Sequence, residues 1–255
     1  MKRIVIKVGS AVLTQDGLLA KTRLDNLMNF ISLLRKKSYE VILVSSGAVA
    51  AGHTSLKLDI SDVAQRQALA ALGQPLLMKY YYEGFEKLAI KCAQVLLIAD
   101  DFRAKNRIAH SKNAIEMLLA KNIIPIINEN DVIAVKELLF GDNDQLAANV
   151  AYHFNAKYLM ILTDVDGFYD KNPKVSADAK LQKYIYKIEP KYSQSSNQAS
   201  SSFAQGGIAT KLKAAKFLIE KNIPTFLSSG FDLKYAKEYF LENKHNGGTI
   251  FKIKD

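Results

Sequence analysis

The sequence predicts an α/β fold, a three-layer sandwich with helices on both faces of a mainly parallel central sheet. Short apolar runs, which suit buried strands, alternate along the chain with longer segments whose apolar residues keep helical spacing. That alternation is typical of a doubly wound parallel sheet. The 255 residues, 49% of them hydrophobic, can bury one large core, and we see no internal repeat or clear boundary. We therefore expect a single domain over residues 1–255 with two lobes, at about 1–155 and 156–255.

Each expected strand is a short run of apolar, often β-branched residues. In chain order the strands are expected at residues 3–8, 41–44, 94–98, 123–127, 158–162, 225–227 and 249–253. Residues 181–188 suit a strand or a hairpin. Residues 193–202 are rich in Ser, Gln and Asn and carry almost no apolar side chain, so we expect a mobile segment that covers a site as a lid.

The expected helices show apolar residues at helical spacing, most clearly at Leu24, Leu27 and Ile31. In chain order they are expected at residues 24–34, 63–88, 108–119, 146–154 and 211–219. The second of them is rich in Ala and Leu. We expect it to break near Gly73 and Pro75, because both residue types interrupt helices.

Composition excludes several classes of protein. The single cysteine, Cys92, excludes an internal disulfide and a cysteine-based metal cluster, and the four histidines lack metal-ligand spacing. No apolar run approaches the roughly 18 residues of a membrane-spanning helix. Residues 1–7 do not form a signal peptide, because their apolar run is short and carries a lysine. We expect a cytoplasmic protein with no membrane contact.

The net charge is +10, from 35 Lys plus Arg against 25 Asp plus Glu. Such a surplus suits an anionic ligand, such as a nucleotide or a nucleic acid. Lysines scattered over helix faces explain the surplus equally well. Because the chain shows no RNA-recognition signature and no interleaving of aromatic and basic residues, we expect no nucleic-acid partner. The three consecutive tyrosines at 80–82 suit packing or a subunit contact instead.

A cluster of short polar side chains follows the strand expected at 123–127. It contains Asn128 and Asp131, and Asn143 and Asp144 follow in a second polar stretch. Open α/β sheets place their ligands just past the carboxyl ends of their strands. Asn offers hydrogen-bond donors and acceptors and ionised Asp only accepts, so together they can hold the ammonium and the carboxylate of a free amino acid. A solvated loop remains an alternative, because these are ordinary turn residues.

Two glycine-containing segments follow the first two strands. Lys7 stands inside an otherwise apolar strand, and a buried ammonium is costly unless it is paired. Gly9, followed by Ser10, lets backbone amides approach a ligand closely. Ser46 belongs to the small residues 45–52, which lead from a strand into a helix and can turn backbone N–H groups toward an anion. The exposed end of an edge strand and a tight strand-to-helix turn are the respective alternatives.

Two later segments suit a nucleotide. Residues 163–169 follow the strand at 158–162 and contain an Asp-Gly turn, with Phe168 and Tyr169 placed to flank a flat base or, alternatively, to pack in the core. Residues 205–212 bring a glycine pair to the start of a helix whose first turn carries Thr210 and Lys211, which combines a backbone anion cradle with a cation. The pattern G-x-x-x-x-G-K-[ST] is absent. No G-x-G-x-x-G follows the first strand, which counts against a dinucleotide enzyme.

In combination these motifs resemble the amino-acid kinase family, and above all its members that phosphorylate L-glutamate. The matching segments run in family order over nearly the whole chain, at residues 7–10, 46–52, 127–131, 141–144, 162–164 and 206–211. The sequence Ile-Asn-Glu-Asn-Asp followed by Gly-Asp-Asn-Asp is the most specific part. The resemblance implies the amino-acid kinase fold and ATP-dependent phosphorylation of the γ-carboxylate of L-glutamate, the first step toward proline, with Mg²⁺ on the ATP phosphates.

The resemblance also implies a role for each site residue. Lys7 and Lys211 would neutralise the transferring phosphoryl group, and Asp144 would organise the two lysines. The implied substrate-binding residues are Ser46, Asn128, Asp131 and Asn143. The implied ATP-binding residues are Lys7, Gly9, Ser10, Thr163, Asp164, Gln205, Gly206, Gly207, Ile208, Ala209, Thr210 and Lys211. The first lobe would hold the substrate and the second the nucleotide, and no metal ligand is expected among the protein side chains.

The chain departs from the family pattern in two places. Many members carry an appended RNA-binding-like PUA domain, which we do not expect here because the chain ends at Asp255, shortly after the last expected strand. Ala204-Gln205 stands where the family often has Gly-Thr, which weakens the backbone cradle locally. We expect a homo-oligomer, a dimer or tetramer, with feedback inhibition by proline at the glutamate site. The alternatives are another family member, acting on acetylglutamate, aspartate, carbamate or a nucleoside monophosphate, and a nucleic-acid-binding protein.

Overall fold

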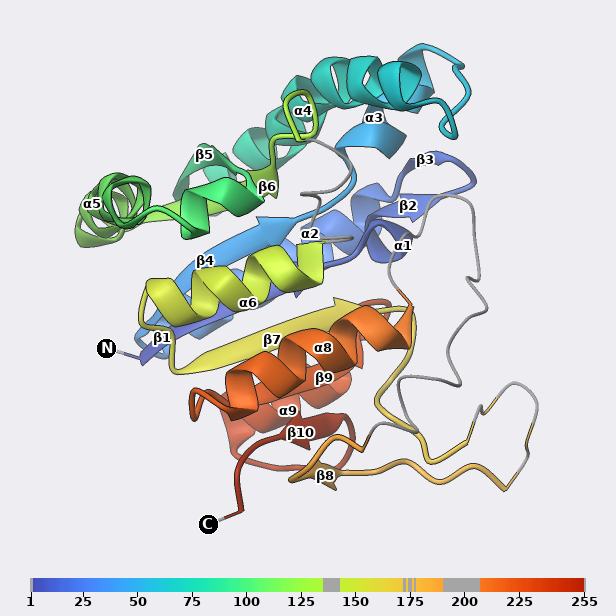
Figure 1. Ribbon diagram of the computed structural model, residues 1–255, viewed down its shortest axis with the longest axis vertical. Helices are drawn as coiled ribbons and strands as arrows, with labels where there is room; N and C mark the ends of the chain where they lie inside the picture. Colours follow the sequence, from blue (N-terminus) through green and yellow to red (C-terminus); the bar gives the residue numbers. More distant parts are fainter. Residues whose placement is uncertain are drawn as a thin grey trace.

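The computed structural model describes residues 2–134, 143–171, 173, 176, 178–189 and 207–254, in which an eight-stranded sheet carries helices on both faces (Figure 1). The strand order is β5-β6-β4-β1-β7-β9-β10-β8, and of its pairs only β9 with β10 is antiparallel. The predicted α/β fold with a mainly parallel sheet is confirmed. The strands are β1 (Lys2–Val8), β4 (Tyr39–Ser45), β5 (Lys91–Leu97), β6 (Ile123–Glu129), β7 (Tyr158–Thr163), β8 (Tyr184–Ile185), β9 (Thr225–Ser229) and β10 (Thr249–Phe251).

The helices form one layer on each face of the sheet. One core contains residues of α2, α4 and α9, and the other contains residues of α5, α6 and α8. In Figure 1, α6 and α8 lie in front of the sheet and α2 and α9 behind it. Among the described residues, no helix is both long and apolar enough to cross a membrane. The helices are α1 (Ser10–Leu13), α2 (Lys21–Lys36), α3 (Ala48–Ser55), α4 (Val63–Glu86), α5 (Lys105–Ala120), α6 (Asn143–His153), α8 (Ile208–Ile219) and α9 (Lys234–Glu242), with a 3-10 turn η1 (Ala99–Phe102).

The alternation of side chains along each strand decides which layer a polar residue meets. In β1, Ile4 and Ile6 belong to the core on the α2 and α4 side, whereas Val5 belongs to the core on the α6 and α8 side. Because successive side chains of a strand point to opposite faces, Lys7 shares the face of Val5. The same rule places Asn128 on the α4 face, the face of Ile126. The strands from β5 to β9 in the sheet order run parallel, so their polar carboxyl ends meet along one edge of the sheet.

Two glycines bring α3 and α4 into direct backbone contact. A Cβ atom at Gly52 would lie 2.0 Å from the carbonyl oxygen of Leu69, and one at Gly73 would lie 1.9 Å from that of Ala48. No side chain fits at either distance, so both positions require glycine. The segment that follows β4 is therefore packed against α4, which gives the polar edge of the sheet a rigid neighbour.

The helix α4 does not break where we expected. It runs without interruption from Val63 to Glu86, through Gly73 and Pro75. Gly73 serves the contact with α3 instead of ending a helix. Pro75 removes one backbone N–H donor to the carbonyl of Ala71, but both residues are exposed, so water can satisfy that carbonyl. The predicted break was wrong because an exposed proline costs a long, well-packed helix less than its local pattern suggests.

Other differences concern short elements. Neither α9 nor the hairpin of β2 (Thr14–Gln15) and β3 (Leu18–Leu19) was predicted from the sequence. The strand or hairpin expected at 181–188 contains only the short β8 and an isolated bridge between Tyr169 and Leu181. The segment 193–202, which we expected to form a lid, lies outside the described residues.

Candidate active site

Three charged side chains meet at the carboxyl edge of the sheet, between α6 and α8. The ammonium of Lys7, from β1, lies 2.5 Å from Asp144 Oδ1, and the ammonium of Lys211, from α8, lies 3.1 Å from Asp144 Oδ2. All three residues are buried, and Asp144 has no exposed surface at all. A carboxylate that pairs with two ammonium groups offsets part of the cost of burying each. Lysine inside the first strand is therefore paired, and the alternative of an exposed edge strand does not apply, because β1 lies inside the sheet.

The first turns of α6 and α8 are tied to each other beside this cluster. The hydroxyl of Thr210 donates to Asp144 Oδ2 at 2.9 Å, and the side-chain amide of Gln145 donates to the carbonyl oxygen of Thr210 at 3.1 Å. Helix amino termini carry partial positive charge. Two of them, together with two ammonium groups and one carboxylate, give this corner of the molecule a net attraction for anions.

A second cluster consists of neutral polar groups. The amide nitrogen of Asn143 lies 3.0 Å from the hydroxyl oxygen of Ser46 and 2.8 Å from Asn128 Oδ1. Ser46 follows the last residue of β4 and precedes Gly47, whose φ of 106° is a left-handed conformation that favours glycine. Because Asn143 and Asp144 are neighbours on α6, the charged and neutral clusters are adjacent. The structure thus brings together three of the four residues predicted to bind the substrate.

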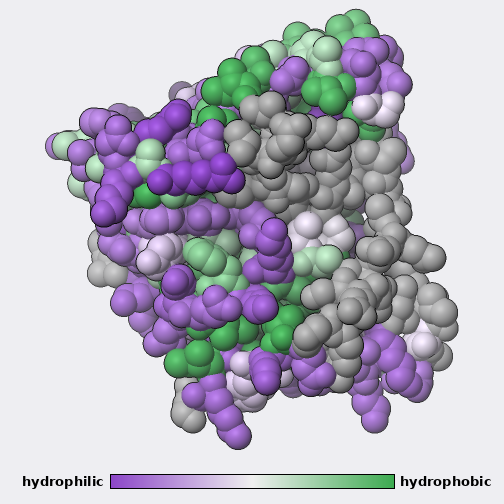
Figure 2. Space-filling model, viewed as in Figure 1, coloured by the Kyte–Doolittle hydropathy of each residue, from purple (hydrophilic) through white to green (hydrophobic). Residues whose placement is uncertain are grey.

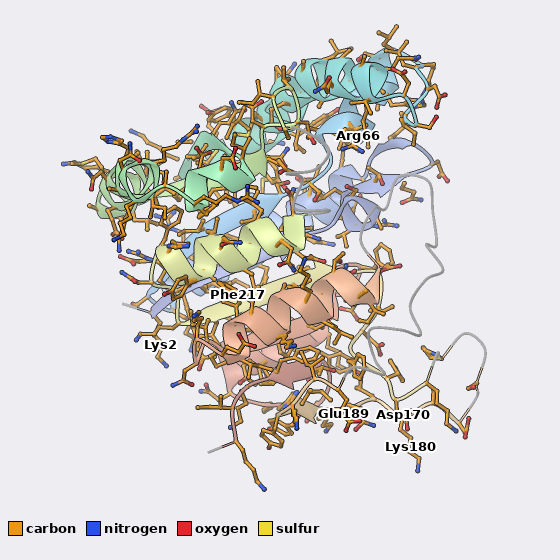
Figure 3. The ribbon with its side chains drawn as sticks, in the orientation of Figure 1. Lys2, Arg66, Asp170, Lys180, Glu189 and Phe217 are labelled. Atoms are coloured by element: carbon orange, nitrogen blue, oxygen red, sulfur yellow. The ribbon has the colours of Figure 1, made fainter. Side chains whose placement is uncertain are left out.

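Asp131, the fourth residue, lines a cavity of about 200 Å³ between α4 and the ends of β5 and β6. Burial raises the pKa of Asp131, and the positive charge of Arg66 partly opposes this rise. Arg66 lies near the start of α4, beside α3 (Figure 3). Gln74 lines the same cavity, and it accepts a hydrogen bond from Asn128 at 2.9 Å. Gln74 therefore contacts the neutral cluster and also lines the cavity that contains Asp131.

The described residues predicted to bind ATP come from the end of β1 and the segment after it, the end of β7 and the start of α8. The backbone N–H of Gly9 donates to Leu162 at 3.1 Å, which joins the end of β1 to β7, and Ser10 begins α1. Thr163, the last residue of β7, donates its hydroxyl to the exposed Asp164 at 3.0 Å. Gly207 is the residue before α8, whose first turn contains Ile208, Ala209 and Thr210. Gln205, Gly206 and the residues Gly141 and Asp142 of the matching motif lie outside the described residues.

The side chain of Phe168 belongs to the hydrophobic core. Its side chain is buried, with its ring 6.2 Å from that of Phe251 in an edge-to-face arrangement. Of the two interpretations left open for the aromatic pair, packing in the core therefore applies to Phe168. Tyr169 is half-buried and donates its hydroxyl to Asp166.

Two polar residues of α4 that support the site were not predicted from the sequence. Gln74 contacts Asn128, and seven residues later the hydroxyl of Tyr81 lies 2.8 Å from that of Ser45. A spacing of seven places both on one face of the helix. The nearby buried positions Ala70, Leu77 and Met78 are apolar, so a glutamine at a buried helical position is the signal that could have found this support.

The arrangement suits the transfer of an anionic group. Lys7 and Lys211 can attract an anion from one shared carboxylate, and the adjacent amides and hydroxyl can orient a polar acceptor beside it. Histidine or cysteine takes no part in either cluster. The geometry thus favours chemistry that needs positioning and charge neutralisation more than proton transfer.

Comparison with known proteins points in one direction. The chain matches the sequence model of a family described as the amino acid kinase family over residues 2–229. It is 48% identical to a glutamate 5-kinase from Wolinella succinogenes, with 98% of each chain covered, and 47% identical to a glutamate 5-kinase from Leishmania donovani, with 98% of this chain and 95% of that protein covered. Among solved structures, an isopentenyl phosphate kinase from T. acidophilum matches with a TM-score of 0.67 at 13% identity, over 98% of this chain and 99% of the other. At that identity the match concerns the fold alone.

Proposed function

The chain belongs to the amino acid kinase family, and from this premise we propose that it is a glutamate 5-kinase. It transfers the γ-phosphoryl group of ATP to the γ-carboxylate of L-glutamate, which gives L-glutamyl 5-phosphate in the first step of proline biosynthesis. Two relatives with that name are 47% and 48% identical to nearly the whole chain. The structural observation that carries the proposal is the buried set of Lys7, Asp144 and Lys211 beside a cluster of neutral polar groups.

The proposed reaction needs no general base. A γ-carboxylate oxygen of glutamate forms a bond to the γ-phosphorus of ATP, and the bond from that phosphorus to the bridging oxygen breaks. ADP leaves with the electron pair. The reference pKa of a glutamate carboxyl is about 4.3, so the nucleophile is already ionised near neutral pH. The protein has to hold two anions in line and reduce their repulsion, which is mainly an electrostatic task.

Lys7 and Lys211 are proposed to bind the phosphoryl group during transfer. Their ammonium groups reach the site from different elements, β1 and α8, and contact different oxygens of Asp144. Asp144 is proposed to fix the distance between the two ammonium groups. Phosphoryl transfer is promoted by positive groups that neutralise charge on the equatorial oxygens, and pre-positioned groups do this without reorganising in the transition state.

The neutral cluster and Asp131 are proposed to bind glutamate. Ser46, Asn128 and Asn143 supply hydroxyl and amide groups, and Asp131 supplies a carboxylate for the α-ammonium. The strands β4, β5 and β6, which carry or border these groups, lie on one side of β1 in the sheet, and β7 lies on the other side. This order supports our proposal of a substrate lobe at about 1–155 and a nucleotide lobe at about 156–255.

ATP is proposed to lie against Gly9, Ser10, Thr163, Asp164 and the first turn of α8. Both oxygens of Asp144 already contact lysines or Thr210, so this donor set suits lysine positioning better than metal binding. We therefore propose that Mg²⁺ binds the phosphates of ATP and that the protein holds the ATP. Mg²⁺ would supply additional positive charge to the phosphate oxygens. Gln205 and Gly206 belong to the same proposal on sequence grounds.

Hydroxylamine trapping tests the proposal directly. The purified protein is incubated with MgATP and L-glutamate, and hydroxylamine converts the acyl phosphate to a hydroxamate that can be quantified. Release of ADP is followed in parallel with and without glutamate. Hydroxamate formation that requires both ATP and glutamate supports the proposal. Good turnover of acetylglutamate, aspartate, carbamate or a nucleoside monophosphate without turnover of glutamate would assign the chain to another member of the family.

We also propose that the protein forms a homo-oligomer, a dimer or a tetramer. Exposed apolar side chains on α4 and in the turn after β6 support this, among them Val63, Leu72, Val132 and Ile133. Figure 2 shows hydrophobic surface in the upper part of that view, where α4 lies. Light scattering after size exclusion tests the proposal, and a monomer at micromolar concentration would contradict it.

We also propose that proline inhibits the enzyme and that the protein is cytoplasmic. Proline carries an α-ammonium and a carboxylate, so it can compete for the groups that bind glutamate, and inhibition that glutamate relieves would support this. Two features fit a cytoplasmic location. The proposed reaction uses ATP, and the thiol of Cys92 is buried and forms no disulfide.

A further inference from the structure

Four side-chain amides form a continuous hydrogen-bonded chain under the neutral cluster. Asn143 donates to Asn128 at 2.8 Å, Asn128 donates to Gln74 at 2.9 Å, and Gln74 donates to Gln94 at 2.9 Å. The members come from α6, β6, α4 and β5. Asn143, Asn128 and Gln74 are buried, whereas Gln94 lies at the exposed edge of the sheet. We call this set the amide chain.

Backbone groups fix the direction of the amide chain. The carbonyl oxygen of Ser45 lies 3.2 Å from one arm of the Asn143 amide, and because a carbonyl only accepts, that arm must be the nitrogen. The backbone N–H of Glu129 donates at 2.9 Å to one arm of the Asn128 amide, which must therefore be the oxygen. Both assignments agree, so Asn128 turns its nitrogen toward Gln74. Gln74 then has to present its oxygen to Asn128 and its nitrogen to Gln94.

The direction of the amide chain decides what Asn143 can offer a ligand. Its nitrogen is turned toward Ser45, Ser46 and Asn128. Its oxygen, on the other arm of the planar amide, points away from these groups and can accept a hydrogen bond from a ligand. An acceptor suits an ammonium and repels a carboxylate. Gln74 thus acts at a distance: it satisfies the buried nitrogen of Asn128, whose oxygen, together with the carbonyl of Ser45, holds the Asn143 amide in place.

We propose that Gln74 is a positioning residue that makes the site selective for a substrate with an α-ammonium group. This inference rests on the proposed phosphorylation of glutamate. Gln74 binds no substrate in this account. Without its oxygen, the buried N–H₂ group of Asn128 has no partner, and the Asn128 amide, which accepts from Asn143, is held by the backbone N–H of Glu129 alone. Gln74 also lines the cavity that contains Asp131, the second group proposed to recognise the ammonium.

Substitution of Gln74 by methionine, which is similar in volume but offers no acceptor of comparable strength, tests the proposal. The matched control is Gln94→Met, at the exposed end of the amide chain, where water can accept from Gln74 in place of the lost side chain. For each variant, kcat and the KM values for L-glutamate and MgATP are measured, together with the preference in kcat/KM for L-glutamate over glutarate, which lacks the ammonium. An unsatisfied buried donor corresponds to roughly tenfold in affinity.

Gln74→Met should raise the KM for L-glutamate and lower the preference over glutarate by roughly tenfold each, while kcat and the KM for MgATP stay within about twofold. Gln94→Met should stay within about twofold in all four quantities. Gln74→Glu, which keeps an oxygen for Asn128, should recover most of the preference. In an Asn143→Ala background, Gln74→Met should cause no further loss of preference, because it acts through Asn143.

A measurement without substrate separates this inference from the proposed function. Selective ¹⁵N labelling of asparagine reports the side-chain amides of Asn128 and Asn143, which should exchange hydrogen slowly in the parent and in Gln94→Met and much faster in Gln74→Met. Unchanged exchange in Gln74→Met, or equal damage to both KM values and kcat, would overturn the positioning role. A parent protein that does not phosphorylate glutamate, with exchange as expected, would refute the proposed function and the selectivity but leave the amide chain intact.

Discussion

Substitution of Asp144 by asparagine should destabilise the folded protein strongly, because it leaves two buried ammonium groups facing each other. In an environment of effective dielectric constant of about 20, the attractions at 2.5 and 3.1 Å amount to about 7 and 5 kcal/mol before desolvation. Burial of the charges offsets much of this. The removal of one member of a buried ion pair costs about 3–5 kcal/mol in practice, and we expect Asp144→Asn to fall in that range.

Thermal unfolding measures the effect. At about 2 °C per kcal/mol for a chain of this size, Tm should fall by about 6–10 °C. The control is Glu83→Gln, which breaks an exposed ion pair with Lys79. The side chain of Lys79 is 69% exposed and that of Glu83 is 55% exposed. That variant should lose about 0.5 kcal/mol or less. The contrast tests burial and not merely the removal of a negative charge.

Added anions give a second readout for Asp144→Asn. Phosphate or sulfate can take the place of the lost carboxylate between Lys7 and Lys211, so it should raise the Tm of the variant more than that of the parent. A Tm equal to or above that of the parent, or equal stabilisation of both proteins by phosphate, would refute the account of Asp144 as the group that holds two charged lysines in place.

Lys7→Ala and Lys211→Ala should each lower kcat about 10²–10³-fold in an ADP-release assay, with a smaller change in the KM for glutamate, and a near-normal kcat would remove that lysine from the catalytic role. Burial raises the pKa of Asp131, so glutamate binding by the parent should weaken as pH falls through that raised value, and Asp131→Asn, which binds weakly at all pH values, should show only the titration of the substrate. Because the folded state favours the protonated carboxyl, ionised Asp131 costs stability above that pKa, and Asp131→Asn should raise Tm at pH 8; a lower Tm would show a structural role. Gly9→Ala should leave stability within about 0.5 kcal/mol, since the nearest protein atoms to the new Cβ lie at 3.7 and 3.8 Å, but it should raise the KM for ATP; an unchanged KM would show that ATP does not approach Gly9 closely.

Much of the site could be predicted because its signals are local. A lysine in an apolar strand, short polar residues after strand ends and a glycine pair before a helix each stand in a few consecutive residues. The alternation of strands and helices then brings those strand ends to one edge of the sheet. This is why Lys7, Asn128 and Asn143 were identified from the sequence and lie within two adjacent clusters in the structure.

What the sequence analysis missed depends on contacts between distant segments. Nothing near Gln74 indicates that α4 passes behind β6, and its contact with Asn128 joins residues 54 positions apart. The hairpin of β2 and β3 is a different case, because its turn contains Asp16 and Gly17 with φ of 52° and 75°. An Asp-Gly pair is a strong hairpin signal, so this element could have been predicted.

The central place of β1 limits how the molecule can move. Along Ile4 to Val8, this strand is paired on one side with β4 and on the other with β7, so continuous hydrogen bonding joins the strands proposed to carry the glutamate site to those proposed to carry the ATP site. A swing of one lobe about a hinge, as in two-lobed enzymes that close over their ligands, would have to tear the ladder between β1 and β7. If the two substrates bind where we propose, the stiffness of the sheet sets the spacing between them, and we expect side chains and loops at the carboxyl ends of the strands to control entry and exit.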